Sequence, residues 1–333
     1  MKISVIIPAY NCAQTLRNSI DSIFKSGLED YEIIVVDDGS SDGTAVLCDT
    51  LPSSFPMLRV YHQENSGVSS ARNRGLREAQ GDYVWFFDAD DTVDPESMTR
   101  VLEIIRREEP DMLLFGMSFD YYHKGKVYRR DEMSFMQNLT VSHNTLSQVI
   151  QKAYASNYLS PCWNKLIRRN ILTSNGVFFQ EGMILLEDLL FTLDALQVCE
   201  KVCFLEDVIY RYRQPEDEGN AARRLKKIPS LVDYMDRFAS VPQEWSSILD
   251  AVYYMLLHQK VRASNAKEIS EIAEDHKRSC FQPLTQQDHW LCEQLENGNY
   301  RRLYLRNMKS RVRHGVAVFA KSHGLYPTNG VRK

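Results

Sequence analysis

The sequence contains no apolar run close to the roughly 18 residues that a membrane-spanning helix needs. The apolar run at its start is interrupted at Pro8, too early for the core of a signal peptide. Its seven cysteines include no CxxC pair, which argues against a disulfide framework and against a zinc site. We therefore expect a protein without a transmembrane segment that stays in the reducing cytoplasm.

Strong net charge and biased composition are also missing. The net charge is −4, so the chain has no overall attraction to nucleic acid, and we expect no such partner. Hydrophobic residues make up 44% and charged residues 25%, the proportions of a globular protein rather than a disordered or fibrous one. At 333 residues the chain exceeds the roughly 50–200 residues typical of one domain, which predicts two domains.

Acidic residues are absent from the last part of the chain. Between positions 301 and 333 there are nine Lys or Arg and no Asp or Glu. Apolar residues such as Leu305, Met308 and Val312 recur three or four positions apart, as on one side of a helix. Two interpretations remain open for this basic tail: an amphipathic segment lying on an anionic inner membrane leaflet, or a terminal helix that packs on the protein or is disordered.

What the sequence does contain is an alternation of strand and helix patterns. Runs typical of buried strands cover 3–7, 32–36, 58–62, 83–87 and 112–119, with helical patterns between most of them. This alternation predicts an α/β fold with a mostly parallel central sheet flanked by helices. Open sheets of this class bind ligands beyond the carboxyl ends of their strands, so polar clusters at those ends are candidate site residues.

The pattern changes after residue 120. The predicted elements are a hairpin over 121–129, helices over 144–154 and 187–199, and two short strands over 202–205 and 208–212. The predicted domains are 1–213, with halves 1–119 and 120–213, and a helical C-terminal region over 214–333 that ends in the basic tail 301–333.

Two polar clusters close the first two predicted strands. PAYN begins at Pro8, which has no N–H and is therefore predicted to end its strand, and Asn11 is a candidate N-cap of the helix that follows. In DDGSSDGT, Asp38 exceeds what a helix cap requires. A carboxylate at that place can accept hydrogen bonds from ribose hydroxyls or a base N–H, so it is a candidate ligand contact.

A third cluster, FFDADD, follows the strand at 83–87. Asp88 and Asp90 project from the same side of extended backbone, and Asp91 is predicted to point away or to cap the next helix. Oxygen ligands without His or Cys favour Mg²⁺ or Mn²⁺, which bind one or two carboxylates together with substrate phosphates. The alternative is an ordinary polar turn after a strand.

Other charged residues lie at predicted helix starts. Arg72 falls in the first turn of a helix at about 68–80, where the helix dipole disfavours a cation. Two interpretations remain open: Arg72 binds an anionic or base ligand, or it lies on a solvated face of the helix. Glu187 and Asp188 open the helix at 187–199, either as favourable first-turn acids or as functional carboxylates.

Taken together, PAYN, VVDDGSSDGT, GVSSARNRGL and GDYVWFFDADD occur in an order and spacing that resemble the family-two glycosyltransferases. These are inverting enzymes of GT-A fold that use nucleotide-diphosphate sugars. The resemblance covers about 1–213, which it implies is the GT-A catalytic domain, with a nucleotide-binding half followed by an acceptor and catalytic-base half. The rival enzyme classes are nucleotidyltransferases and dinucleotide-dependent oxidoreductases, which also use doubly wound sheets. No GxGxxG follows the first strand, which argues against the oxidoreductases.

The resemblance implies a role for each matching residue of the donor site. Pro8, Tyr10 and Asn11 match the loop that lies along the nucleotide. Asp38 and Arg72 match the positions that contact the base and ribose. Asp88 and Asp90 match the DxD motif, with Asp90 as the direct ligand of Mn²⁺ or Mg²⁺ and Asp88 closer to the ribose.

The second half of the matching region carries the remaining implied roles. Asp188 matches the catalytic base, with Glu187 as its neighbour or substitute. Trp163 could stack on a sugar and Lys165 could reach phosphate, although a core Trp and a Lys at a helix rim are equally ordinary. Arg213 of YRYR is expected to approach the diphosphate, but the continuation RQPEDEGNAARR departs from the Ser-rich segment typical of the family.

The expected function is therefore metal-dependent inverting transfer of a hexosyl or N-acetylhexosaminyl group from a donor, expected to be a UDP-sugar. The acceptor implied by the resemblance is a glycan or lipid-linked oligosaccharide of surface polysaccharide synthesis. The alternative is a catalytically silent homologue that binds nucleotide sugars or serves as a scaffold. Activity lost in Asp188→Asn with nucleotide binding retained distinguishes the two.

Overall fold

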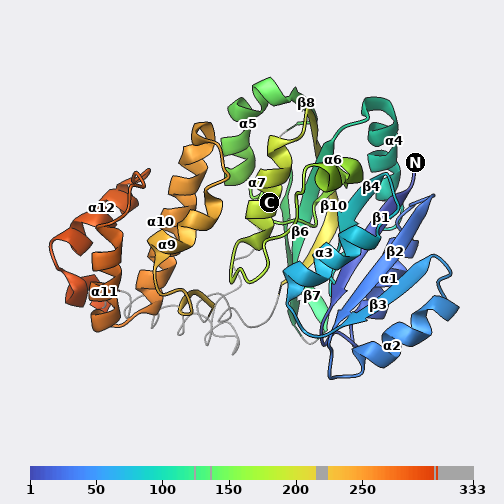
Figure 1. Cartoon of the computed structure of the whole chain (residues 1–333), viewed down its shortest axis with the longest axis horizontal. Coiled ribbons are helices and arrows are strands. Elements are labelled where there is room, and N and C mark those ends of the chain that lie inside the picture. The colour runs from blue at the N-terminus through green and yellow to red at the C-terminus, as the bar shows by residue number, and fades with distance from the viewer. Residues whose placement is uncertain (124, 136, 215–223, 304, 307–333) are drawn as a thin grey trace, which may run out of the picture. The chain divides into compact units, whose positions relative to one another are not determined.

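The computed structural model describes residues 1–123, 125–135, 137–214, 224–303 and 305–306 (Figure 1). The chain divides into two compact units, Met1–Glu218 with Ser240–Trp245 and Gly219–Ala239 with Ser246–Lys333. All the predicted site residues belong to the first unit. The predicted basic tail, apart from 301–303 and 305–306, lies outside the described residues.

The first unit is built on one mixed sheet. Its strands are β1 Ile3–Ala9, β2 Tyr31–Asp38, β3 Leu58–Gln63, β4 Tyr83–Phe86, β5 Thr92–Val93, β6 Met112–His123, β7 Lys126–Met133, β8 Leu139–Ser142, β9 Lys165–Arg168 and β10 Lys201–Gln214. They are ordered β3-β2-β1-β4-β9-β6-β10-β5, with β7 beside β6 and β8 beside β10. The first four pair in parallel, as predicted from their fully apolar runs, whereas β9 pairs antiparallel with both β4 and β6.

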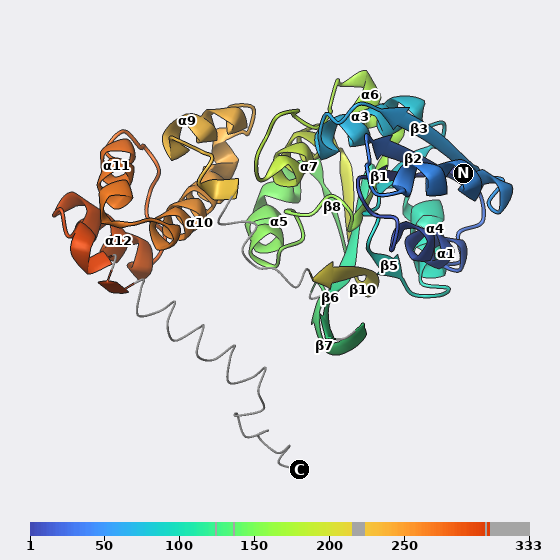
Figure 2. The ribbon, with the colours of Figure 1, turned by 90° about the horizontal axis from the view of Figure 1, so that it is seen from below.

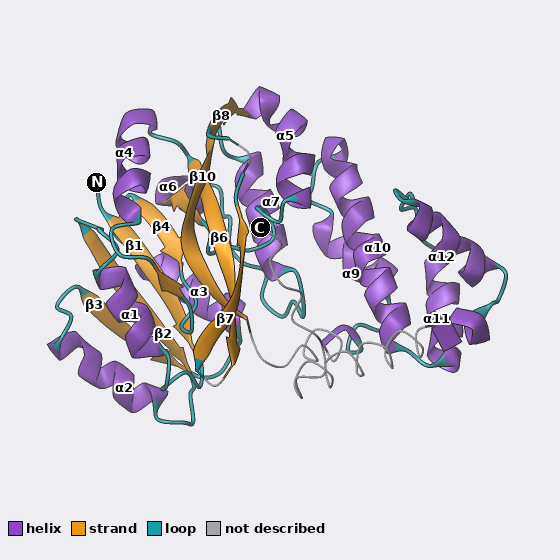
Figure 3. Ribbon diagram, turned by 180° about the vertical axis from the view of Figure 1, so that it is seen from behind, coloured by secondary structure: helices purple, strands orange, loops and turns teal. Residues whose placement is uncertain are grey.

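Helices cover both faces of this sheet. They are α1 Leu16–Phe24, α2 Thr44–Thr50, α3 Val68–Glu78, α4 Met98–Glu108, α5 His143–Ala155, α6 Arg169–Ser174 and α7 Glu187–Gln197. The helices α3 and α6 lie on one face, and α1 and α4 lie on the other (Figures 2 and 3). The α3 backbone comes close to β1 at Gly75, where a Cβ atom would lie 2.3 Å from Ile6 Cγ2. This close approach fixes the start of α3 beside the ends of β1 and β2.

Two predictions about the first strand are wrong. Strand β1 continues through Pro8, which pairs with Val36 of β2. The backbone of Ile6 faces β4, because its carbonyl accepts from Phe87 N–H, and the backbone of Pro8, two residues later, faces the same way. Strand β4 has already ended at Phe86, so the N–H that Pro8 lacks is not needed to pair with it. Asn11 is not an N-cap either, because α1 begins only at Leu16 and Asn11 has a left-handed backbone with φ of 51°.

A third correction concerns the last strand. The two short strands predicted over 202–205 and 208–212 are one strand, β10, which pairs in parallel with β6. The register shifts between Phe204 and Val208, so the polar residues that appeared to separate two strands form an irregularity within one. This continuity carries Tyr210 and Arg213 to the same end of the sheet as the acidic cluster.

The second unit is helical, as expected from its sequence. Its helices are α9 Leu231–Met235, α10 Ser246–Ala263, α11 Ala266–His276 and α12 Gln286–Glu296. Both α11 and α12 begin with capping boxes, made by Asn265 with Glu268 and by Thr285 with Asp288. None of the helices that the structure describes is long and apolar enough to cross a membrane.

Candidate functional site

The carboxyl end of β4 and the starts of α3 and α7 converge on one group of charged side chains. Arg72 of α3 lies at its centre, and its guanidinium is 4% exposed. Its Nη2 donates to Asp88 Oδ1 at 2.9 Å, and its Nη1 donates to Asp188 Oδ1 at 2.6 Å. The cation that opposes its own helix dipole is thus stabilised by two carboxylates, one after β4 and one on α7.

Asp188 combines this ion pair with access to solvent. Its side chain is 22% exposed, and its Oδ2 accepts a weak hydrogen bond from Cys162 N–H at 3.4 Å. The predicted helix start is confirmed, because α7 begins at Glu187. The preceding Leu186 has a left-handed backbone with φ of 64°, which a leucine rarely adopts. Such local strain often accompanies functional sites because surrounding structure must hold it in place.

Asp38, the last residue of β2, holds the loop that leads into α3. Its Oδ1 accepts from Ser66 N–H and from Gln63 Nε2, both at 2.9 Å, and its Oδ2 accepts from Gly67 N–H at 2.8 Å. Three protein donors therefore already use this carboxylate. Any contact with a base or ribose has to use the lone pairs that remain.

The PAYN loop connects to the loop after β2 through Asn11. Its side-chain oxygen accepts from Ser41 N–H at 2.8 Å, and its own N–H donates to Ser40 Oγ at 3.0 Å. Tyr10, the neighbouring aromatic residue, is exposed. The two loops that end β1 and β2 are thus tied together beside an accessible aromatic ring.

The acidic cluster at 88–91 contains mutually repelling carboxylates. The protein around Asp90 leaves its carboxyl accessible but removes part of its water shell, and this desolvation, together with the charge of Asp88, raises the pKa of Asp90 to about 6. Burial also raises the pKa of Asp88, against the opposing effect of Arg72. Asp90 is exposed and makes no ion pair with any described residue. A cation at Asp90 and Asp88 would relieve this repulsion, so the donor set suits a hard divalent ion.

The cluster does not form a complete protein cage for a metal. Among the described residues, no three His, Cys, Asp or Glu side chains are grouped as metal ligands. Asp91 is one reason, because its side chain points away from the other two carboxylates and into the protein, as one of the two predicted alternatives had it. The other alternative is wrong, since the N-cap of the next helix, α4, is Ser97. A divalent ion here must therefore take most of its ligands from substrate and water, which is common for Mg²⁺ and Mn²⁺.

Asp91 and Tyr210 form a buried pair that sequence reasoning missed. Tyr210 Oη donates to Asp91 Oδ2 at 2.7 Å and accepts from Asp88 N–H at 3.0 Å. Asp91 Oδ1 accepts from Arg213 N–H at 2.7 Å. Burial, with the charges of Asp88 and Asp90, raises the pKa of Asp91 well above its ordinary value. The pair joins the backbone of the acidic cluster to the end of β10.

Tyr210→Phe is expected to lower the free energy of unfolding by about 1–3 kcal/mol, because it leaves a buried carboxylate and an N–H with one partner fewer. Urea denaturation measures this loss. The matched control is Tyr212→Phe on the same strand, whose hydroxyl makes no hydrogen bond with a described residue. Equal losses in the two variants would contradict the assigned role of the Tyr210 hydroxyl.

Two predicted contacts with substrate are not supported by the positions of their side chains. Trp163 is 5% exposed and stacks on Tyr210 with ring centroids 4.3 Å apart, so it belongs to the core. Lys165 is a strand residue, not a helix-rim residue, and is fully buried. Its Nζ donates to Pro161 O and to Asn164 Oδ1, and burial lowers its pKa to about 7. A lysine in this place supports the site from inside rather than reaching phosphate.

Arg213, near the end of β10, lies close to Asp90 of the acidic cluster. Its guanidinium stacks over Tyr122 at 4.4 Å from the ring centroid, and its charge opposes the rise in the pKa of Asp90. Arg213 is half-buried, so it remains close to the cluster and partly accessible.

Comparison with known proteins assigns the chain to a family. Residues 4–190 match the profile of Glycosyl transferase family 2. The uncharacterized glycosyltransferase EpsJ of Bacillus subtilis is 29% identical over 71% of this chain and 67% of its own length. The cholesterol galactosyltransferase of Borreliella burgdorferi is 29% identical over 63% of this chain and 59% of its own length. The chain thus spans about three-fifths to two-thirds of these two relatives.

Solved structures show the same fold. The crystal structure of TarS 1–349 of Staphylococcus aureus in complex with UDP-GlcNAc matches with a TM-score of 0.56 and 20% identity, over 93% of this chain and 92% of that chain. The mannosyltransferase PcManGT of Pyrobaculum calidifontis, in complex with GDP-Man and Mn²⁺, matches with a TM-score of 0.53 and 19% identity, over 98% and 88%. Because the family profile matches more than half of the sequence, this protein belongs to glycosyl transferase family 2, and it has the GT-A fold.

Proposed function

We propose that the protein transfers a sugar from a nucleotide-diphosphate donor, with inversion, to a glycan or lipid-linked acceptor. The observation that carries this proposal is the ion-pair bridge through Arg72, which brings Asp88 of the acidic cluster and Asp188 of α7 to one place. A family-two transferase needs a donor phosphate site and an acceptor base side by side. In this proposal Asp88 belongs to the donor site and Asp188 is the acceptor base, and Arg72 holds the two together although they lie far apart in the sequence.

The proposed donor is a UDP-sugar. TarS was solved with UDP-GlcNAc and PcManGT with GDP-Man, so nucleotide sugars are the ligand class of two proteins with this fold. Pro8, Tyr10 and Asn11 would lie along the nucleotide. Asp38 would contact the base or ribose. It would also position the nucleotide through the loop before α3, since it accepts hydrogen bonds from Ser66 N–H and Gly67 N–H.

Asp90 and Asp88 would hold Mn²⁺ or Mg²⁺ together with the donor diphosphate. When bound, the ion supplies positive charge that stabilises the leaving nucleotide diphosphate. Arg213 adds a second positive group beside the same cluster. The metal-bearing relative PcManGT supports this assignment.

Asp188 is the proposed general base. In an inverting transfer the acceptor hydroxyl attacks the anomeric carbon and loses its proton in the same step, and a carboxylate within hydrogen-bond reach accepts that proton. Asp188 is partly exposed, so it can meet the acceptor, while Arg72 orients it through Oδ1. Glu187 precedes it on the same helix turn and is the neighbouring carboxylate.

The proposed acceptor is inferred from what the relatives of the chain are named for. The relatives include a protein named for minor teichoic acid biosynthesis, GgaB of Bacillus subtilis, and a poly(ribitol-phosphate) β-N-acetylglucosaminyltransferase, TarS. We place the present protein in surface polysaccharide synthesis at the inner face of the cell membrane. The transferred group would be a hexose or an N-acetylhexosamine.

A donor screen tests this function. The purified protein is incubated with Mn²⁺ and, separately, UDP-glucose, UDP-galactose, UDP-GlcNAc or GDP-mannose, and release of the nucleoside diphosphate is measured. Release from one donor well above the rate without protein is the expected result. Tight binding of a donor without release, with and without a lipid-linked oligosaccharide acceptor, would favour a silent homologue instead.

A further inference from the structure

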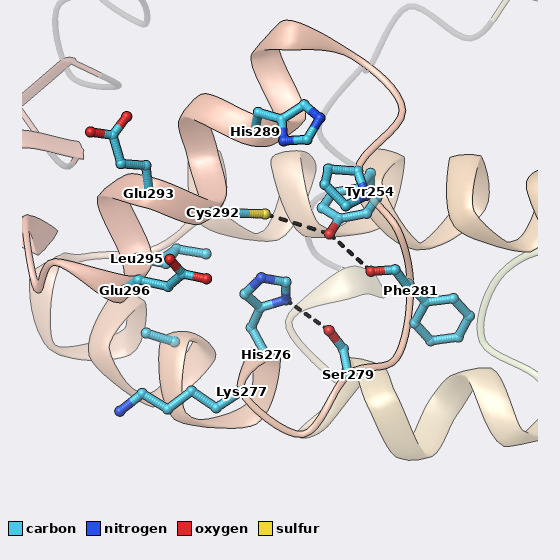
Figure 4. A pocket seen from close by; sticks show the side chains of 12 residues that line it. Tyr254, His276, Lys277, Ser279, Phe281, His289, Cys292, Glu293, Leu295 and Glu296 are labelled. Atoms are coloured by element: carbon cyan, nitrogen blue, oxygen red, sulfur yellow. Dashed lines mark hydrogen bonds between the residues drawn. The ribbon is translucent and has the colours of Figure 1, made fainter.

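A second candidate binding site lies in the helical unit, away from the acidic cluster in sequence. A cavity of about 350 Å³, open to solvent on one side, is lined by residues of α10, α11, α12 and the loop at 279–283 (Figure 4). This volume falls within the range of small-molecule sites, at its lower end. It suits one sugar-sized ligand rather than a nucleotide sugar.

A buried imidazole points into this cavity. His276 is 9% exposed, and its Nδ1 lies 2.8 Å from Tyr253 Oη and 3.2 Å from Ser279 Oγ. Its Nε2 has no partner among the described residues, and Figure 4 shows it turned toward the side where Cys292 and Glu296 lie. Burial lowers the pKa of His276, which favours the neutral ring. With two hydroxyl groups around Nδ1, the free Nε2 is the ring nitrogen left to a ligand, as a donor in one tautomer and as an acceptor in the other.

The remaining polar lining includes donors, such as Lys277 and His289, and the carboxylates of Glu293 and Glu296. Both glutamates are exposed and make no ion pair with a described residue, and in Figure 4 only the Glu296 carboxylate points toward His276. Lys277 is paired with Glu274 at 2.6 Å. Two unpaired carboxylates repel phosphate and carboxylate ligands. No three His, Cys, Asp or Glu side chains of the described residues are grouped as metal ligands here either.

The cavity also has apolar walls. Phe281, Pro283 and Leu295 contribute to the lining, beside the ring of Tyr254. The Tyr254 hydroxyl donates to Phe281 O at 3.2 Å, which holds the loop against α10. A carboxylate and an imidazole nitrogen next to aromatic and aliphatic surface match a ligand with many hydroxyls and apolar C–H faces, since hydroxyls can donate to the one and donate to or accept from the other.

We propose that this cavity binds one neutral sugar unit, through Glu296 and His276. That the bound sugar is a unit of the acceptor glycan rests on the proposed function, whereas the binding of a sugar in this cavity does not. In that setting the helical unit would hold a sugar of the acceptor while the first unit carries out transfer.

The test uses the full-length protein with free glucose, galactose and N-acetylglucosamine as probes, followed by saturation-transfer NMR. At least one sugar is expected to bind, and Glu296→Gln is expected to weaken its affinity about tenfold, because a charge-assisted hydrogen bond is lost. The matched control is Glu271→Gln, an exposed residue of α11 outside the lining, which should leave the affinity unchanged. Bound sugar should also protect Cys292 from iodoacetamide while exposed Cys280 still reacts.

Three results would overturn the proposal: no binding of any probe, equal binding in Glu296→Gln, or tighter binding of glucose 6-phosphate than of glucose. UDP binding in the presence of Mn²⁺ is measured on the same preparation. Retained UDP binding with no sugar binding rejects only the second site. Sugar binding without UDP binding rejects the proposed donor site and leaves the cavity assignment standing.

Discussion

Replacing Asp188 with Asn is expected to lower turnover by about 100- to 10,000-fold, the range typical of losing a general base. The amide keeps the size of the carboxylate but cannot take the acceptor proton. Donor affinity should change little, because Asp188 lies on the acceptor side of Arg72 in the proposed arrangement. The rate of UDP release at saturating donor and acceptor measures the effect, and calorimetry measures donor affinity.

Glu187→Gln is the matched control for this experiment, since it makes the same chemical change one residue earlier on α7. It should keep most of the activity. A larger loss in Glu187→Gln than in Asp188→Asn would move the base to Glu187. Full activity in both variants would rule out a base on this helix.

The second large effect is expected from Arg72→Met. Its removal leaves Asp88 and Asp188 without their shared cation, and breaking a buried ion pair typically costs about 3–5 kcal/mol. Arg72→Lys should show a smaller loss, because an ammonium group keeps the charge but cannot form both contacts in the same way. The free energy of unfolding in urea measures both.

The stability lost in Arg72→Met should shrink as the pH falls. The pKa of Asp88 is raised in the folded protein, so the folded state binds a proton more readily than the unfolded chain, and protonation removes one of the two repelling charges. The control is Arg77→Met on the same helix, whose exposed side chain stacks on Phe178. A loss in Arg72→Met no greater than in this control would contradict the assigned bridge.

The sequence indicated where the site would lie because each acidic cluster follows an apolar run. Asp38 ends β2 and Asp88 comes soon after β4, two strands whose runs of buried residues identify them as central, and ligands of such sheets gather at those ends. The unfavourable place of Arg72 in its helix indicated that its charge needs an explanation, but the two expected explanations, a ligand or a solvated helix face, are not what the structure has. Arg72 is buried and pairs with two carboxylates of the protein. These inferences need only local pattern and electrostatics.

Which partner Arg72 takes could not be predicted in the same way. Asp188 is 116 residues further along the chain, and only tertiary packing brings it within 2.6 Å. The DADD cluster likewise gives no local sign that Asp91 turns inward, because its partner Tyr210 arrives on a strand 119 residues later. Neither expectation for Lys165, a contact with phosphate or a place on a helix rim, fits the structure. It begins β9, a strand of four residues between β4 and β6, and its side chain is buried.

The most direct test of a metal-dependent donor site is calorimetric titration of UDP into the protein with and without Mn²⁺, with NAD as the unrelated nucleotide. The matched variant is Asp90→Asn, and Asp82→Asn, an exposed Asp in the turn before β4, serves as control. Micromolar UDP binding that requires Mn²⁺, persists in Asp82→Asn and is lost in Asp90→Asn is the predicted result. UDP binding that is independent of Mn²⁺ and of Asp90, or no stronger than NAD binding, would contradict the proposed site.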